Sequence, residues 1–510
     1  MRIQSKIARS LAPLGAAVLL MLGAGPATAA TCESLSSMKL PGAMVTLAQP
    51  VAAGAFTAPA GRAGRGAGPD FSDLPAFCRV AATLTPTPDS DIKIELWMPA
   101  AGWNGKFLAV GNGGWNGNID TNALATALRR GYAAASTDTG HQGGGGPWMQ
   151  NREKLIDYGH RAVHEMTVTS RALINELYGN APRFSYFNGC SAGGRQGLIA
   201  AQRYPDDFDG IVAGAPALNA TGRAAFAVWI AQNNLKNDAS VIPAAKFPAI
   251  HDAVLQACDA LDGATDRLIE NPKACKFDPQ VMACKAGDSP TCLTPGQVET
   301  ARIMYQPLVN PRTKEQIFPG LAYGSELGWN TFGGQQPFGI ATQMYQFMLF
   351  NDPKWDYKTL NFDSHMAQVA KIENGQINAL DTNLKPFFAS GGKLIQYHGW
   401  ADPQIVAANS TEYYERVLKA MGGASNVTNH YRLFMVPGMA HCGGGTGPST
   451  FDMLAALEQW VENGKAPDSV QASRVTAGKV ERTRPLCVYP QRAVYKGSGS
   501  LDDAANFACK

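Results

Sequence analysis

The chain has 510 residues, of which 17% are charged, and its formal net charge is only +3. This balance argues against a nucleic-acid-binding protein and against attachment to an anionic membrane, because both need clustered positive charge. The length exceeds a single hydrophobic core of ordinary size, so we expect two domains or one domain with a large insertion.

The first 29 residues have the three parts of a secretory signal peptide. Three basic side chains lie among the first nine residues, residues 11–25 are apolar, and residues 27–29 form a small-residue cleavage site. A membrane anchor is the alternative, but the apolar run is too short to span a bilayer comfortably. We expect residues 1–29 to be removed and the protein to be secreted, either to the medium or to the periplasm.

Strand and helix patterns alternate along the rest of the chain. Apolar and polar residues alternate over 92–98, which predicts a half-buried strand. Apolar side chains lie near one face over 161–178, and Gly179 predicts the helix end. Further strands are expected at 107–110, 132–136, 183–187, 209–214, 393–399 and 431–436, with a closing helix at 453–461. This alternation predicts an α/β protein with a parallel sheet.

The pattern changes between about residues 218 and 388. This stretch holds four of the ten cysteines, an acidic cluster and many aromatic residues. We interpret residues 218–388 as an inserted lid domain, and residues 30–217 together with 389–510 as the catalytic domain.

The ten cysteines are expected to form five disulfides, because an exported protein enters an oxidising compartment. No C-x-x-C pair is present, which disfavours zinc binding and thioredoxin-like chemistry. Spacing alone leaves the pairing open, although Cys258–Cys275 and Cys284–Cys292 are the simplest local pairs. The ten are Cys32, Cys78, Cys190, Cys258, Cys275, Cys284, Cys292, Cys442, Cys487 and Cys509.

A nucleophile motif follows the strand predicted at 183–187. Ser191 lies in a G-x-S-x-G sequence between that strand and a helix, which is the pattern of the nucleophile elbow in α/β-hydrolases. Asp402 and His441 each follow a predicted strand, in the Ser-Asp-His order of that fold. Taken singly, Asp402 could be a turn residue before Pro403, and His441 a surface histidine. Their joint order favours a catalytic triad.

Each end of this triad has a cysteine beside it. Cys190 directly precedes Ser191, and Cys442 directly follows His441. A disulfide between the two cysteines would hold the nucleophile against its base. Together these motifs indicate a secreted serine hydrolase.

The backbone of a glycine-rich loop is the candidate for one half of an oxyanion hole. Ala192 would supply one N–H group, and Gly113 or Gly114 the other, because glycine lets the backbone approach a substrate closely. We favour Gly114. The loop could instead be only flexible or bind phosphate, but it lacks the lysine of a phosphate loop.

These motifs together resemble the tannase and feruloyl esterase family, which includes terephthalate monoester hydrolases. The resemblance rests on the Cys-Ser, Asp and His-Cys motifs, on residues 103–107 and on residues 436–439, and it covers the mature chain. It implies an α/β-hydrolase core with a lid, the triad of Ser191, Asp402 and His441, and the bridges Cys190–Cys442, Cys32–Cys78 and Cys487–Cys509.

The resemblance also implies a structural Ca²⁺ ion in the lid. Three carboxylates around a glycine turn, at residues 259–268, suit a hard cation, although the spacing is not that of an EF-hand. An acidic surface turn is the alternative. Arg267 departs from the family, which has glycine there, and its charge could weaken binding. The implied ligands are the carboxylates of Asp259, Asp262 and Asp266 and the backbone carbonyls of Ala264 and Leu268.

The resemblance implies hydrolysis of feruloyl (hydroxycinnamoyl) or galloyl esters, as small aromatic esters or as esters of plant cell walls and polyphenols. Residues 338–352 contain no arginine to bind a free carboxylate, which disfavours terephthalate monoesters. A calcium-dependent polyphenol- or polysaccharide-binding protein without catalysis and a serine peptidase are the rival functions. We expect the lid aromatics to form mainly a lid core, with a few lining an aromatic pocket: Trp329, Phe332, Phe338, Tyr345, Phe347, Phe350 and Trp355.

Overall fold

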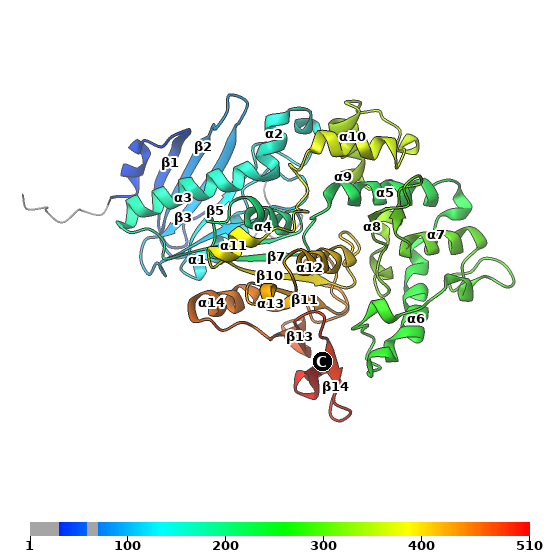
Figure 1. Cartoon of the computed structure of the whole chain (residues 1–510). Coiled ribbons are helices and arrows are strands. Elements are labelled where there is room, and N and C mark those ends of the chain that lie inside the picture. Colours follow the sequence, from blue (N-terminus) through cyan, green and yellow to red (C-terminus); the bar gives the residue numbers. More distant parts are fainter. Residues whose placement is uncertain (1–29, 59–69) are drawn as a thin grey trace, which may run out of the picture.

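The computed structural model describes residues 30–58 and 70–510, so the expected signal peptide lies outside the described residues. A nine-stranded sheet runs through the molecule in the order β1-β2-β3-β5-β4-β6-β7-β10-β11 (Figure 1). Its strands are β1 (Ala43–Val51), β2 (Phe77–Leu84), β3 (Ile92–Pro99), β4 (Lys106–Val110), β5 (Ala133–Thr137), β6 (Phe184–Cys190), β7 (Gly210–Gly214), β10 (Lys393–Gly399) and β11 (Tyr431–Val436).

The sheet is antiparallel at one edge and parallel elsewhere. Strands β1, β2, β3 and β5 pair antiparallel, and the strands from β5 through β4, β6, β7 and β10 to β11 pair parallel. Helices cover both faces, which is why all five residues of β5 are buried. This is the α/β-hydrolase architecture predicted from the sequence.

Two hydrophobic cores lie on opposite faces of this sheet. Helices α3 (Ala162–Tyr178), α4 (Ala192–Arg203) and α12 (Ala408–Ala420) pack in one core. Helices α1 (Thr121–Arg129) and α14 (Met453–Asn463) pack in the other. The helix predicted at 161–178 and the strand predicted at 92–98 are confirmed within one or two residues.

Strands β1 and β2 are not predicted by the sequence pattern. β1 is an edge strand with half-exposed residues and carries Pro50, which an edge strand tolerates. β2 alternates between buried and partly buried positions, but several of these are alanine, so hydropathy gives little contrast. Both strands take their structure from pairing with β3, which the local sequence does not encode.

Residues 218–388, here called the insertion, contribute no strand to the nine-stranded sheet in the part of the chain described. Figure 1 shows this segment, in green and yellow, beside the sheet and largely to its right. Its main elements are α5 (Ala220–Asn234), α6 (Phe247–Cys258), α7 (Pro295–Tyr305), β8 (Leu308–Val309), β9 (Gln316–Phe318), α8 (Asn330–Gly333), α9 (Gly339–Gln343), α10 (Ser364–Glu373) and the start of α11 (Lys385–Ala389).

The insertion has a hydrophobic core that it shares with the segment after β4. Phe226 and Trp329 of the insertion are buried in the same cluster as Trp115, Trp148 and Tyr158. The insertion is therefore packed onto Trp115 and residues 148–158 of the sheet-forming part.

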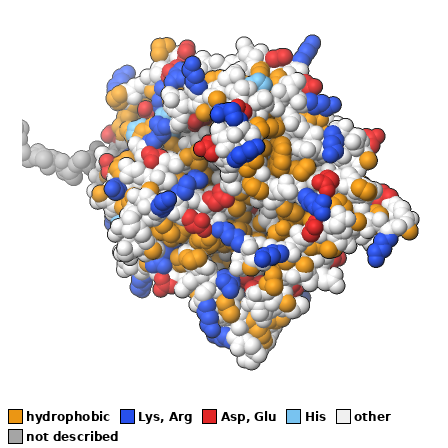
Figure 2. Space-filling model, turned by 45° about the vertical axis from the view of Figure 1, so that its right-hand side comes forward, with side chains coloured by type: hydrophobic (Ala, Val, Ile, Leu, Met, Phe, Trp, Pro, Cys, Tyr) orange, Lys and Arg blue, Asp and Glu red, His pale blue; other side chains and the backbone are white. Residues whose placement is uncertain are grey.

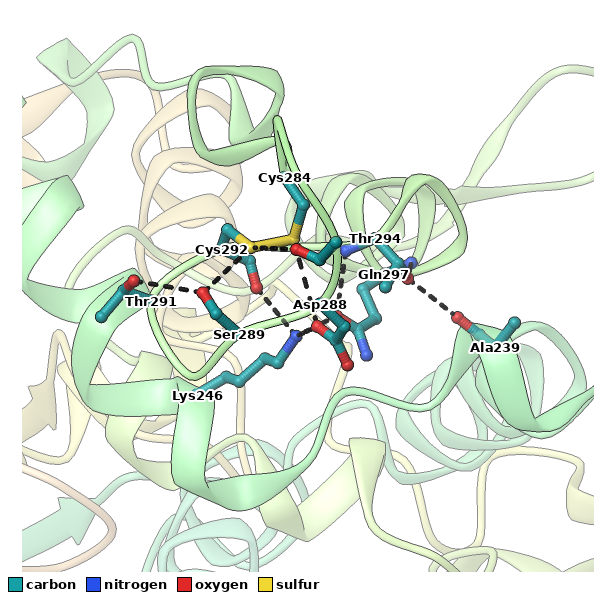
Figure 3. The surroundings of a disulfide bond; sticks show 10 residues. Ala239, Lys246, Cys284, Asp288, Ser289, Thr291, Cys292, Thr294 and Gln297 are labelled. Atoms are coloured by element: carbon teal, nitrogen blue, oxygen red, sulfur yellow. Dashed lines mark hydrogen bonds and ion pairs between the residues drawn. A yellow bond between two sulfur atoms is a disulfide. The ribbon is translucent and has the colours of Figure 1, made fainter.

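All ten cysteines are paired, in the five combinations that the sequence analysis considered: Cys32–Cys78, Cys190–Cys442, Cys258–Cys275, Cys284–Cys292 and Cys487–Cys509. Figure 3 shows the surroundings of Cys284–Cys292. The buried ammonium group of Lys246 donates to the Cys292 carbonyl at 2.8 Å and to Gln297 Oε1 at 2.7 Å, and it pairs with Asp288. This lysine fixes the small disulfide loop to α7.

The surface carries charges of both signs. Figure 2 shows hydrophobic side chains gathered toward the middle of the face that brings the insertion forward, with acidic and basic side chains around them. Over the described residues, no helix has both the length and the apolar character needed to cross a membrane.

Candidate active site

Ser191 occupies a strained turn between β6 and α4. Its backbone has φ 66° and ψ −120°, a left-handed conformation that a residue with a side chain rarely adopts. Two hydrogen bonds fix the turn: Ser191 N–H donates to Gly214 O at 2.9 Å, and Ala217 N–H donates to Ser191 O at 3.1 Å. The strain is a feature of the nucleophile elbow, which projects a hydroxyl from the sheet edge.

Three glycines allow this turn to form. A Cβ atom on Gly189 would lie 2.8 Å from Gly193 Cα, and one on Gly111 would lie 2.5 Å from the same atom. Such distances are too short for any side chain, so the backbones of β6, α4 and the loop after β4 meet only because all three residues are glycine. The G-x-S-x-G pattern therefore has a direct steric cause here.

Asp402 and His441 are in contact, as the sequence order suggested. Asp402 is buried after β10, and its Oδ2 lies 2.7 Å from His441 Nδ1. The other carboxylate oxygen accepts N–H groups of Gln404 at 2.8 Å and Ile405 at 2.9 Å. Because His441 Nδ1 faces a carboxylate, it carries the proton, and Nε2 is left free to accept one.

His398 is a further residue of this site, and the sequence analysis assigned it no role. Its Nε2 lies 2.9 Å from Ile405 O and 3.2 Å from Asp402 Oδ2, so this nitrogen must be a donor. Its Nδ1 accepts the Ser410 hydroxyl at 2.7 Å. Only the position of His398 at the end of β10, four residues before Asp402, could have signalled the contact.

The two histidines determine the charge state of Asp402. Burial acts to raise the pKa of this carboxyl, but the hydrogen bonds from His398 and His441 outweigh burial and hold the pKa well below its ordinary value. Asp402 is therefore ionised at neutral pH and can stabilise positive charge on the ring of His441.

One cavity of about 600 Å³ brings two distant segments of the chain together. Cys190, Ser191, His441 and Cys442 all line it, and the disulfide Cys190–Cys442 joins the two segments across 252 residues. In the described part of the chain, no hydrogen bond joins the Ser191 hydroxyl to the His441 ring. Such bonds are often long before substrate binds.

The glycine-rich loop after β4 forms another wall of the cavity. Gly113, Gly114 and Ala192 line it together with Ser191. A pair of buried side chains holds this loop to α4: Asn112 N–H donates to Gln196 Oε1 at 3.0 Å, and Gln196 Nε2 donates to Asn112 Oδ1 at 3.1 Å. This reciprocal contact, which sequence reasoning missed, positions the backbone that faces the nucleophile.

The aromatic side chains at the cavity are not those expected from the sequence. None of the seven lid aromatics is among the lining residues, and Trp329, Phe332 and Tyr345 are buried inside the insertion core. Trp115 and Tyr158 line the cavity instead. The prediction that a few lid aromatics line this pocket is wrong, because packing within the insertion uses them.

Residues 259–268 form a buried acidic turn. Asp259, Asp262 and Asp266 are 6%, 8% and 8% exposed, and each carboxylate accepts at least one backbone N–H of the turn. Burial raises the pKa of Asp259, and it raises the pKa of Asp262 to about 6. Arg484 pairs with Asp266, and the buried Glu270 lies nearby at 3.7 Å from Arg484.

Arg267 is directed away from this turn. Its φ of 66° explains why glycine is usual at the position, and its side chain is 69% exposed and pairs with Asp252 at 2.7 Å. The cationic residue suspected of disturbing the acidic turn therefore contacts a surface carboxylate instead.

The acidic turn is chemically suited to a divalent cation. Arg482 and Arg484 both pair with Asp266, and burial raises the pKa of Glu270 to about 8, so the three aspartates alone leave negative charge in excess in a buried place. The ligand atoms of the three aspartates do not all lie within 4.8 Å of one another; in the part of the chain that the structure describes, the one group of three that meets this distance is Cys284, Asp288 and Cys292. Both of its sulfur atoms are in a disulfide.

The fold and the elbow define this protein as an α/β-hydrolase. Residues 78–510 match the family described as tannase and feruloyl esterase, so the chain belongs to that family. It is a carboxylic ester hydrolase of the feruloyl esterase and tannase type.

Relatives match almost the whole chain. An uncharacterized esterase of Xanthomonas campestris pv. campestris is 38% identical, over 98% of this chain and 94% of its own length. The crystal structure of feruloyl esterase B from Aspergillus oryzae has a TM-score of 0.87 at 34% identity, covering 94% of this chain and 99% of that one. Tannin acyl hydrolase from Aspergillus niger shares the fold, with a TM-score of 0.76 at 21% identity over 93% and 92%.

Proposed function

We propose that this protein is a secreted serine esterase that hydrolyses esters of aromatic acids, of the feruloyl (hydroxycinnamoyl) or galloyl type, through an acyl-enzyme. The observation that carries the proposal is the 2.7 Å contact of His441 with buried Asp402, at a cavity that also holds Ser191 on a strained elbow. The family to which the chain belongs, and the name of its structural neighbour, support the substrate class.

The proposed reaction begins with attack of Ser191 Oγ on the ester carbonyl carbon. His441 Nε2 takes the hydroxyl proton, and Asp402 stabilises the resulting imidazolium. The N–H groups of Ala192 and Gly114 would receive the negative charge of the carbonyl oxygen. His441 then gives its proton to the alcohol, which leaves, and the acid stays bound to Ser191. Water, activated by the same histidine, releases the acid.

Aromatic side chains on the cavity wall support the proposed preference for esters of aromatic acids. Trp115 and Tyr158 are buried side chains that line the cavity and pack edge-to-face, with ring centroids 5.3 Å apart. A flat substrate ring that contacts such side chains gains about 0.5–1.5 kcal/mol beyond simple area burial. This gain raises the rate only where the contact persists in the transition state.

We expect a panel of esters to show this preference. Methyl ferulate or methyl gallate should have a higher kcat/KM than a butyrate ester with the same alcohol, measured side by side at one pH. A butyrate ester as the best substrate would contradict the aromatic pocket. Labelling of Ser191 by a fluorophosphonate separates the esterase from a calcium-dependent binding protein without catalysis, and tests on peptide bonds address the peptidase rival.

We also propose a structural calcium site at the acidic turn. Asp259, Asp262 and Asp266 would hold the ion through carboxylate oxygens, with the backbone carbonyls of Ala264 and Leu268. When bound, the ion supplies positive charge that neutralises buried carboxylates and orders the turn. Its role is structural, because none of these residues lines the cavity that holds Ser191.

We expect removal of calcium to lower the melting temperature. An ion that binds only the folded state stabilises it by about 2.7 kcal/mol at one hundred times its dissociation constant. Chelation should therefore shift the midpoint of thermal unfolding downward, and Asp262→Asn should abolish that shift. Asp278→Asn, which changes an exposed aspartate paired with Arg302, is the matched control. An unchanged midpoint with no calcium by elemental analysis would refute the site.

We also propose that the protein is exported from the cytoplasm. The signal-peptide pattern at residues 1–29 and the five disulfides support passage into an oxidising compartment. N-terminal sequencing of the protein recovered from the medium or the periplasm should begin near Ala30.

A further inference from the structure

Arg223 is a buried cation on the wall of the active-site cavity. It lies in the first turn of α5, is 7% exposed, and is one of the residues that line the space around Ser191. Within residues 30–58 and 70–510, its guanidinium forms no ion pair and donates no hydrogen bond, and its Nε is buried without a partner. The ring of Phe338 lies 5.3 Å from its Cζ atom.

Arg195, a second arginine that lines the same cavity, has hydrogen-bond partners within the chain and therefore has a structural role. The guanidinium of Arg195 donates to the carbonyls of Gly159 and Ile377 at 3.0 Å each, and to that of Tyr158 at 3.3 Å. Burying a charged group without partners is costly, and buried polar groups are normally paired. Arg195 is paired in this way. The N–H groups of Arg223 have no acceptor among the described residues, so they are free to bind a ligand.

Among the described residues, no carboxylate of the site forms an ion pair with Arg223. Asp402 is engaged by His398 and His441 and lies outside ion-pair distance of the guanidinium. Asp120 lines the cavity but is exposed and accepts backbone N–H groups at the start of α1. Burial lowers the pKa of Arg223 to about 10, so the side chain is still charged at neutral pH.

The chemistry of the missing partner follows from the guanidinium group. Its planar arrangement of N–H donors matches the two oxygens of a carboxylate, and such charge-assisted pairs are stronger than neutral hydrogen bonds. Trp115 and Tyr158 line the same cavity and offer an aromatic surface. A ligand with an apolar or aromatic body and a carboxylate end fits both features.

We propose that Arg223 is a specificity-determining residue that binds a free carboxylate of the ester substrate. This inference rests on the proposed esterase function and specifies its substrate class further. Residues 338–352, where such an arginine was expected for this substrate class, contain none. Arg223 of α5 lies on the cavity wall instead, so we expect esters with a free carboxylate to be good substrates.

Two pairs of esters test the inference, each pair differing in one charge. Monomethyl terephthalate is compared with methyl 4-carbamoylbenzoate, which places the charge on the acid side. Caffeoyl quinate is compared with the corresponding quinic amide ester, which places it on the alcohol side. In at least one pair, the wild-type kcat/KM should favour the carboxylate by about 10-fold or more, as expected for hydrogen bonds to a charged group.

Substitutions at Arg223 should change that ratio. Arg223→Gln keeps hydrogen-bond donors but removes the charge, so the ratio should fall toward one, whereas Arg223→Lys should retain part of it. An equal loss on charged and neutral esters would overturn carboxylate binding and indicate a structural role. A wild-type ratio near one overturns the inference even if the glutamine variant does not fold, and a high ratio that Arg223→Lys lowers through the charged ester alone supports it.

Hydrolysis of methyl ferulate distinguishes a failure of this inference from a failure of the proposed esterase function. If methyl ferulate is hydrolysed and both wild-type ratios are near one, carboxylate recognition by Arg223 is overturned and the esterase stands. If no ester is hydrolysed, the esterase and the inference fall together.

Discussion

Ser191→Ala should lower kcat for aromatic esters by roughly 10⁴-fold or more, because it removes the atom that would form the acyl-enzyme in the proposed reaction. The Ser191 hydroxyl makes no hydrogen bond as a cap of α4, so the fold should be little affected. Steady-state kinetics with methyl ferulate and a thermal unfolding curve measure the two effects separately.

A buried serine elsewhere provides the matched control. Ser170 lies on α3 outside the cavity, and its hydroxyl has no partner among the described residues. Ser170→Ala should leave kcat and KM near the wild-type values. If Ser191→Ala retains comparable activity, Ser191 is not the nucleophile, whatever the geometry of its turn.

Loss of the Cys190–Cys442 bridge is the second change with a large expected effect. This disulfide closes 252 residues. By the loop-entropy relation, such a bridge contributes about 5.5 kcal/mol to the free energy of unfolding. Because it joins the neighbours of Ser191 and His441, the double variant Cys190→Ala/Cys442→Ala should also lose kcat at temperatures far below its unfolding midpoint.

The Cys284–Cys292 bridge is a control of the same chemistry. It closes only 8 residues, for which the loop-entropy relation gives about 2.5 kcal/mol. Neither cysteine lines the active-site cavity. Its double alanine variant should therefore be less stable than wild type but retain kcat. Equal kcat in both double variants would show that the Cys190–Cys442 bridge does not set the distance between nucleophile and base.

Those parts of the site that depend on local sequence patterns could be predicted from the sequence. The elbow around Ser191 is readable because Gly189 and Gly193, which approach each other too closely for side chains, leave a fixed spacing in the chain. Helices and strands with clear periodicity are also found within a few residues. The order of Asp402 and His441 after β10 and β11 follows from the topology of the fold.

Other parts of the site arise only from tertiary packing. His398 becomes a partner of Asp402 because the turn after β10 folds back on the strand end. The lid aromatics have the composition of a binding pocket, yet burial within the insertion removes Trp329 and Tyr345 from the cavity. Arg223 could not be predicted from the sequence, because a single arginine in an alanine-rich helix belongs to no recognisable motif.

The insertion is not a detachable module. Trp115 directly follows the glycine-rich loop, and its Nε1 donates to Ile340 O of α9 at 3.0 Å, while the Tyr158 hydroxyl donates to Gly114 O at 2.8 Å. Both rings belong to the core of the insertion. An engineer who exchanged this insertion for that of a relative would thereby remove the support of the loop that faces Ser191. Grafts between such enzymes should therefore transfer Trp115 and residues 148–158 together with the insertion.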